Sequence, residues 1–153
     1  EKVDFNALVT KVADMIRGEA AERDIELALA LDPALPHIHG DRVQLQQVVL
    51  NLVRNAMEAV AAGSEFRRVM LTTQTGEGRS IRIAVSDSGI GIPEHARAHI
   101  FEPFYTTKRQ GTGMGLAVSR RIVEAHGGRL YASRSCLGGA QLALELPITK
   151  EEP

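Results

Sequence analysis

Three short blocks of amide, acidic and glycine residues follow one another in a fixed order along this chain. They are residues 51–56 (NLVRNA), 87–93 (DSGIGIP) and 111–116 (GTGMGL). Each block has polar or side-chain-free positions where a protein core would have apolar bulk, which lowers stability unless something binds there. Amides, a carboxylate and uncovered backbone amides are groups that contact a cation, a base and phosphates. Together the blocks predict a nucleotide pocket.

The first block lies on a predicted helix, residues 41–62, with Asp41 as its N-cap. Gln47, Asn51 and Asn55 recur on it four residues apart and therefore share one face. A carboxamide oxygen can ligate Mg²⁺ while its neutral charge leaves the metal able to attract phosphates. The alternative is that the asparagines only cap a loop or bond buried backbone, and the spacing alone does not separate the two.

The second block begins at Asp87, directly after a predicted strand. A carboxylate at a strand end can accept a hydrogen bond from the exocyclic amine of adenine. Guanine has a carbonyl there, and the unpaired groups would weaken binding by about 1–3 kcal/mol. Gly89 and Gly91 let the backbone approach a flat ring, and Ile92 follows them. D-S-G is also a common turn, so this block by itself is a weak signal.

The third block precedes a predicted helix over residues 112–126. Its members are Gly111, Thr112, Gly113, Met114, Gly115 and Leu116. Successive amides with little side-chain cover at a helix start form a site for phosphate. The block departs from G-x-G-x-x-G because leucine stands last, and the chain has no G-x-x-x-x-G-K-[ST], which excludes a P-loop. In the preceding loop, Phe104 is expected to anchor the chain to the core, and Lys108 to reach a phosphate unless it is merely solvated.

Hydrophobic periodicity and turn residues predict the elements that position these blocks. Helices are expected at 5–22, 41–62 and 112–126, and strands at 25–31, 69–75, 80–86, 130–135 and 141–146. Their order predicts an α+β, two-layer sandwich with three main helices packed on one face of a mixed, mainly antiparallel sheet. We expect one domain over residues 1–150, with 151–153 as a tail.

The composition is that of a soluble globular domain, with 153 residues, 44% of them hydrophobic and 24% charged. A formal net charge of −1 gives no reason to expect nucleic acid or an anionic membrane as a partner. The single cysteine, Cys136, excludes an internal disulfide and a cysteine-based zinc site. No stretch approaches the roughly 20 apolar residues of a membrane span. Because the chain begins at Glu1 without a methionine, we expect a fragment of a longer protein.

Four motifs in order resemble the catalytic ATP-binding domain of sensor histidine kinases. This domain belongs to the GHKL superfamily, which also holds gyrase, MutL and heat-shock chaperone ATPases. NLVRNAMEA is similar to the family's asparagine box, DSGIGIP to its first glycine box, FEPFYTTK to its phenylalanine box and GTGMGLAVS to its second glycine box. The resemblance covers nearly the whole chain. It implies the Bergerat fold, with a lid over roughly residues 95–115 that folds over the nucleotide.

The resemblance implies ATP and Mg²⁺ as cofactors and assigns roles by position. Asn55 would bind Mg²⁺, Asn51 would lie near the phosphates, and Asp87 would hold the adenine amino group. The other positions would line the base or the phosphates: Gly89, Gly91, Ile92, Phe104, Lys108, Gly111, Thr112, Gly113, Met114, Gly115 and Leu116. Asn51, Asn55 and Lys108 are the candidate catalytic residues.

Asn51 also bears on the reaction class. Hydrolytic members of the superfamily have a glutamate four residues before the magnesium-binding asparagine, where it can activate water. An asparagine cannot take that proton, so we expect ATP to be held for a protein acceptor. None of the five histidines fits the family's H-[ED]-x-[RKN]-x-P-like acceptor block. The acceptor is therefore expected on a separate dimerisation domain upstream.

The expected function is that of a two-component histidine kinase, with a response regulator as its downstream partner. A cytoplasmic location is expected, with membrane contact only through N-terminal regions outside this sequence. The alternatives are a GHKL ATPase module, an anti-sigma-type serine kinase and a non-catalytic nucleotide-binding domain.

Overall fold

The computed structural model describes residues 1–61, 65–103 and 115–148. The main sheet has the strand order β2-β4-β5-β7-β6. Its strands are β2 (Glu26–Ala30), β4 (Arg68–Gly76), β5 (Ser80–Asp87), β6 (Arg129–Arg134) and β7 (Ala140–Pro147). β2 pairs with β4 in parallel, and the other neighbours pair antiparallel. The prediction of a mixed, mainly antiparallel sheet is confirmed.

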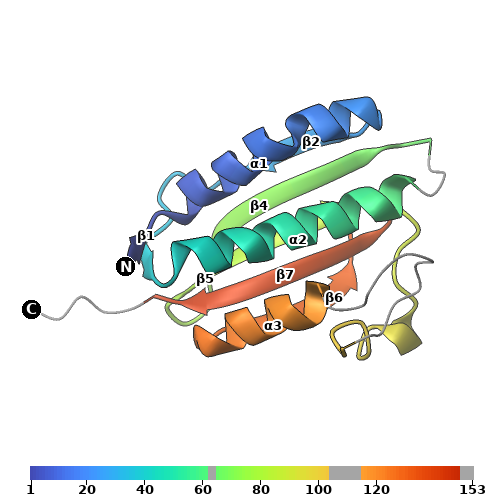
Figure 1. The fold of residues 1–153 in the computed structure, drawn as a ribbon. Coiled ribbons are helices and arrows are strands. Elements are labelled where there is room, and N and C mark those ends of the chain that lie inside the picture. The colour runs from blue at the N-terminus through green and yellow to red at the C-terminus, as the bar shows by residue number, and fades with distance from the viewer. Residues whose placement is uncertain (62–64, 104–114, 149–153) are drawn as a thin grey trace, which may run out of the picture.

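Three helices cover one face of this sheet (Figure 1). They are α1 (Phe5–Glu22), α2 (Arg42–Ala61) and α3 (Gly115–Ala125). Asp4 caps α1 through a bond from the Ala7 amide, and Asp41 caps α2 through a bond from the Gln44 amide. At the end of α3, Gly127 takes a φ of 78°, which favours glycine and stops the helix. The predicted two-layer sandwich is confirmed.

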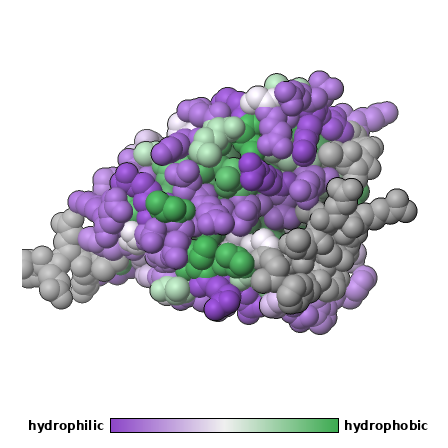
Figure 2. All heavy atoms as spheres, viewed as in Figure 1, coloured by the Kyte–Doolittle hydropathy of each residue, from purple (hydrophilic) through white to green (hydrophobic). Residues whose placement is uncertain are grey.

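Alternation along β5 decides which way the second block faces. Ile81, Ile83 and Val85 are buried against the helices, and Asp87 lies on that same face because side chains alternate along a strand. The buried side of α2 completes this core with Leu45, Val48, Val49, Leu52, Val53, Ala56, Met57 and Val60. Seen from the helix side, the surface is mostly polar, with small separate apolar spots (Figure 2). Asp87 is thus an acidic side chain placed at the end of an apolar layer.

Some elements differ from expectation. The strand predicted over 25–31 is shorter, because Asp32 leaves the ladder and its amide bonds to the Thr73 hydroxyl at 3.0 Å. A small second sheet of β1 (Lys2–Val3) and β3 (Ile38–His39) was not predicted, because two-residue strands carry no periodic signal. A 3-10 helix, η1 (Glu94–Ala96), follows the second block. The predicted start of the third helix at 112 lies outside the described residues.

No helix in the described part of the chain combines the length and the apolar composition needed to cross a bilayer.

Gly18 offers a test of the helix layer that leaves the candidate site untouched. It lies inside α1, and an added Cβ there meets no atom within 4 Å. Because glycine loses more backbone entropy in a helix than alanine, Gly18→Ala should raise the free energy of unfolding by about 0.5–1 kcal/mol. Urea denaturation checks this, and a loss of stability would contradict the exposed position of Gly18.

Candidate nucleotide site

The described residues of the three sequence blocks lie on elements that meet toward one end of the molecule (Figure 1). Figure 1 shows the end of α2, the end of β5 and the start of α3 at the same side of the sheet. Asn51 and Asn55 lie on α2, Asp87 ends β5, and Gly115 begins α3. The predicted site residues Phe104, Lys108, Gly111, Thr112, Gly113 and Met114 lie outside the described residues.

Asp87 is held in place by backbone amides from two segments. Only 4% of the residue is exposed. Its Oδ1 accepts hydrogen bonds from the Gly89 amide at 2.9 Å and from the Ala140 amide at 3.1 Å. No donor in the residues that the structure describes is bonded to Oδ2. One carboxylate oxygen is therefore used by the protein, and the other is the acceptor available to a ligand.

Burial raises the pKa of Asp87 above its usual value, and the two amide bonds, from Ala140 and Gly89, oppose that rise. Burying a carboxylate without a cationic partner lowers the stability of the folded state. A strand end that only supported the fold would not need such a group. The arrangement is typical of a binding position.

A second pair of glycines supports Asp87, and the sequence analysis missed its role. The Gly139 amide donates to the Asp87 carbonyl oxygen at 3.1 Å. A Cβ at Gly139 would collide with Asp87 Oδ1 and would lie 2.7 Å from both the Asp87 carbonyl oxygen and the Gly89 nitrogen. Gly138 takes the positive φ of this turn, 99°. Gly139 is therefore a glycine because a side chain has no room there, whereas Gly138 is a glycine because of its φ. The Gly-Gly pair in the sequence does not separate these two roles.

The two glycines of the DSGIGIP block are glycines for different reasons, Gly89 for space and Gly91 for its backbone conformation. A Cβ at Gly89 would lie 2.6 Å from the carbonyl oxygen of Ala59 on α2, so this turn packs directly on the helix backbone. Gly91 has a φ of 76°, a conformation that favours glycine. Ile92, also in the predicted site, packs against the edge of the core.

Ser88 fixes the turn to the neighbouring strand. Its hydroxyl donates to the Phe66 carbonyl at 2.7 Å and accepts from the Arg68 amide at 2.8 Å. The Ser88 amide donates to the Arg68 carbonyl at 3.1 Å. The turn after Asp87 is thus held from β4 as well as from β7. The sequence D-S-G indicates only a turn residue at Ser88. The strand pairing shows that Ser88 also fixes the turn to β4.

The two asparagines differ in their contacts. Asn55 Nδ2 donates to the Asn51 carbonyl at 2.8 Å, one helical turn earlier. Because the amide nitrogen faces its own helix, Oδ1 is the atom of Asn55 that can ligate a cation. Asn51 Nδ2 donates to the hydroxyl of Ser119 on α3, at a long 3.4 Å. Ser119 is fully buried, so this contact lies between the two helices.

At the start of α3, Gly115 and Leu116 have separate roles. An added Cβ at Gly115 meets no described atom within 4 Å, so packing within the described chain does not require glycine there. Leu116 packs against the core and anchors the first turn of the helix. The described start of α3 is thus fixed by Leu116, while Gly115 is exposed.

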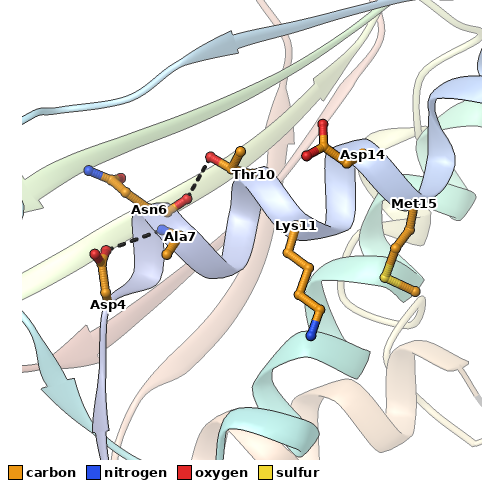
Figure 3. Close-up of a pocket in the computed structure, with 7 residues that line it drawn as sticks. All are labelled: Asp4, Asn6, Ala7, Thr10, Lys11, Asp14 and Met15. Atoms are coloured by element: carbon orange, nitrogen blue, oxygen red, sulfur yellow. Dashed lines mark hydrogen bonds between the residues drawn. The ribbon is translucent and has the colours of Figure 1, made fainter.

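A groove along α1 is lined by Asp4, Asn6, Ala7, Thr10, Lys11, Asp14 and Met15 (Figure 3). It belongs to a different helix from the site residues. Its polar groups serve the fold: the Ala7 amide donates to Asp4 Oδ1 at 3.1 Å, and Thr10 Oγ1 donates to the Asn6 carbonyl at 2.8 Å. The Asn6 side chain donates to the Asp32 carbonyl at 2.6 Å. Nothing in this groove brings reactive groups together. Among the described residues, no three His, Cys, Asp or Glu side chains form a cluster that could hold a metal ion.

Comparison with known proteins identifies the family. The family model described as "Histidine kinase-, DNA gyrase B-, and HSP90-like ATPase" matches residues 40–150, which contain every candidate site residue. The chain belongs to this family. Within this family it is a GHKL-type ATP-binding domain of the histidine kinase kind, and the recognition made from the four motifs is confirmed.

The relatives are sensor kinases. The sensor protein FixL of Bradyrhizobium diazoefficiens is 42% identical over 132 residues, which are 86% of this chain and 26% of FixL. The catalytic domain of histidine kinase ThkA has a TM-score of 0.85 and 32% identity, covering 96% of this chain and 94% of that one. Full-length ShkA in complex with AMPPNP has a TM-score of 0.86 and 35% identity, covering 100% of this chain and 32% of that one. This GHKL-type domain thus spans about a quarter of FixL and about a third of the ShkA chain.

Proposed function

We propose that this domain is the catalytic part of a two-component sensor kinase, and that it transfers the γ-phosphoryl group of Mg-ATP to a histidine on a separate dimerisation domain. The observation that carries the proposal is the buried carboxylate of Asp87, with one oxygen held by two amides and the other available to a ligand. The exocyclic amine of adenine is a donor that matches this oxygen. ShkA, which has the same fold, was solved in complex with AMPPNP.

The residues of the site have distinct proposed roles. Asp87 Oδ2 accepts from the adenine amine, and Gly89 and Gly91 bring the backbone turn against the ring. Asn55 Oδ1 is the proposed Mg²⁺ ligand, because its amide nitrogen is bonded to the helix. When bound, Mg²⁺ neutralises charge that develops on the phosphates. The remaining predicted residues, which would hold the base edge or phosphates from the lid and the start of α3, are Ile92, Phe104, Lys108, Gly111, Thr112, Gly113, Met114, Gly115 and Leu116.

Asn51 favours a kinase over an ATPase. Its side chain is a neutral amide that contacts the Ser119 hydroxyl, and an amide cannot take a proton from water. Without a general base at this position, hydrolysis should be slow. Transfer to a protein acceptor then depends on positioning and charge neutralisation.

The proposed partners are the domain that carries the acceptor histidine and a response regulator. ThkA, a histidine kinase of this fold, has been solved in complex with the response regulator protein TrrA. We propose that the full protein places a dimerisation domain before residue 1, that residues 1–150 form one catalytic domain, and that phosphate passes from the acceptor histidine to the regulator.

The proposed reaction is tested by incubating the chain with γ-labelled ATP and Mg²⁺, alone and with an added dimerisation domain from FixL, whose catalytic region is 42% identical. The chain alone should not label itself and should release little phosphate. The added domain should acquire an acid-labile, base-stable phosphohistidine. Asp87→Asn, assayed in parallel, should label nothing.

Each other result identifies an alternative. Rapid phosphate release by the chain alone would indicate an ATPase module, and acid-stable label on the acceptor would indicate a serine kinase. ATP binding without transfer to any dimerisation domain, including one encoded with this chain, would indicate a non-catalytic nucleotide-binding domain.

A further inference from the structure

The ring of His126 joins the two helices that carry the amide face and the helix start of the candidate site. His126 follows α3, and its Nε2 lies 3.0 Å from the backbone nitrogen of Asp41, the N-cap of α2. Its Nδ1 lies 2.7 Å from the carbonyl oxygen of Ile122, in the last turns of α3. These two contacts are called the His126 bridge below.

Both partners of the ring are backbone groups, and this decides its protonation state. A backbone N–H can only donate and a carbonyl can only accept. Nε2 must therefore be an unprotonated acceptor toward Asp41, while Nδ1–H donates to Ile122. Only the neutral Nδ1–H tautomer satisfies both contacts. An imidazolium would turn a second N–H toward the Asp41 N–H and break the bridge.

The His126 ring packs closely against Gly40. A Cβ at Gly40 would lie 2.7 Å from Cδ2 and 2.9 Å from Nε2 of His126, and 2.9 Å from Cδ1 of Leu45. The ring therefore packs against bare backbone just before α2. The turn of Gly127 and Gly128 that closes α3 holds the backbone of His126 from the other side.

The His126 bridge lies at one end of an antiparallel helix pair (Figure 1). Further along, Asn51 on α2 contacts Ser119 on α3. Asn55 is one turn beyond Asn51, and Gly115 is one turn before Ser119. Since α3 has 11 residues and is about 16 Å long, a small rotation at its bridged end moves its first turn relative to Asn55.

We propose that His126, in its neutral Nδ1–H form, is a positioning residue for nucleotide binding, because it sets where the first turn of α3 lies relative to the amides of α2. The inference rests on the proposed function, since ATP affinity is its readout. The proposal adds that ATP affinity depends on His126, which lies at the end of the helix pair that is remote from the proposed nucleotide site.

Several charged side chains on the segments that meet at the ring have partners of their own. Asp41 Oδ1 accepts from the Gln44 amide at 3.1 Å. Arg42 pairs with Glu1 at 3.5 Å, and Arg120 pairs with Glu124 at 2.9 Å. On β6, Arg129 pairs with Glu145 at 2.9 Å, and the Tyr131 hydroxyl donates to the same carboxylate at 3.0 Å. Arg121 on α3, Arg134 at the end of β6 and His39 on β3 are exposed.

The tautomer is tested first, by ¹H–¹⁵N correlation spectroscopy of the imidazole nitrogens at pH 8. His126 should show the Nδ1–H tautomer, whereas exposed His37 should show the usual mixture in fast exchange. The Asp41 amide should be protected from hydrogen exchange. A dominant Nε2–H tautomer of His126 would overturn the proposal, whatever the variants below do.

Two substitutions separate the contacts. Glutamine can place an acceptor near the position of Nε2, whereas the shorter asparagine reaches only the position of Nδ1. His126→Gln should therefore bind ATP within about threefold of the wild type at pH 8. His126→Asn should bind about tenfold more weakly at the same pH. Equal affinities of the two variants would overturn the proposal.

The outcomes for the two proposals are distinguishable. Equal ATP affinities of His126→Gln and His126→Asn at pH 8 would overturn the role of His126 while leaving ATP binding intact. Failure of the wild type to bind ATP at pH 8 would overturn the proposed function itself. If the variants do not fold, the tautomer and the Asp41 amide protection in the wild type decide whether the bridge exists, and their absence overturns it.

Discussion

Asp87→Asn should lower the affinity of this domain for ATP by about 100-fold while leaving the domain folded. Asparagine Oδ1 can still accept the Gly89 and Ala140 amide bonds. An amide nitrogen then replaces Oδ2 and opposes the adenine amine, donor against donor. The lost charge-assisted bond and the unpaired donor together account for a loss of about 3 kcal/mol. Isothermal titration calorimetry measures it directly.

The same substitution should change base selectivity. An amide nitrogen is a donor that matches the carbonyl of guanine, so the preference for ATP over GTP should fall in Asp87→Asn. Asp14→Asn is the matched control, because Asp14 is an exposed carboxylate on α1 that pairs with Arg17 at 3.5 Å, away from the candidate site. Unchanged ATP affinity in Asp87→Asn would refute the role of Asp87.

The difference in the free energy of unfolding between Asp87→Asn and the wild type should depend on pH. Burial raises the folded-state pKa of Asp87 above 3.8, its value in an unfolded chain. The protonated acid therefore contributes its full stability below pH 3.8, and this contribution is lost as the pH rises through the folded-state pKa. Asparagine does not ionise. At pH 7 the apo variant should be at least as stable as the wild type in urea denaturation, and its advantage should shrink as the pH falls.

Gly139→Ala should damage the same site from the opposite strand. Its methyl group would overlap Asp87 Oδ1 and lie 2.7 Å from the Asp87 carbonyl oxygen and the Gly89 nitrogen. These are backbone and buried atoms that cannot swing aside. We expect the free energy of unfolding to fall by about 1–3 kcal/mol and ATP affinity to fall at least tenfold, because the carboxylate is displaced.

Two comparisons make this result specific. Gly18→Ala is the same chemical change at a site with open space, and it should stabilise the domain. In a double-mutant cycle, Gly139→Ala should reduce ATP affinity much less when Asp87→Asn is already present, since both changes act on one carboxylate. Wild-type ATP affinity in Gly139→Ala, or additive effects in the cycle, would show that Gly139 does not position Asp87.

Local patterns in the sequence were sufficient for most of the architecture. The spacing of apolar residues placed α1 and α2, and Asp41 as N-cap marked where α2 begins. Alternation over residues 80–86 placed Asp87 at a strand end. These features depend on neighbours within a few residues, which is the range that periodicity and turn chemistry report.

The chemistry of the candidate site was also readable from residue types and their order. Asn51, Asn55, Asp87 and the glycine blocks pointed to an adenine nucleotide, and the family relationship confirms that recognition. The roles of individual residues remain predictions. What residue types cannot state is which atom of each side chain the protein itself occupies.

Only the tertiary structure shows which side-chain atoms are bonded within the protein. The Ala140 amide that holds Asp87 Oδ1 is 53 residues away in the chain, and the Asp41 amide that meets His126 is 85 residues away. Both contacts follow from the placement of β5 beside β7 and of α2 beside α3. Strand order and register are set by the packing of the whole core, and a one-residue slip would turn Asp87 to the other face. The sequence by itself therefore determined which groups the site contains, and the tertiary structure decided which of their atoms remain for a ligand.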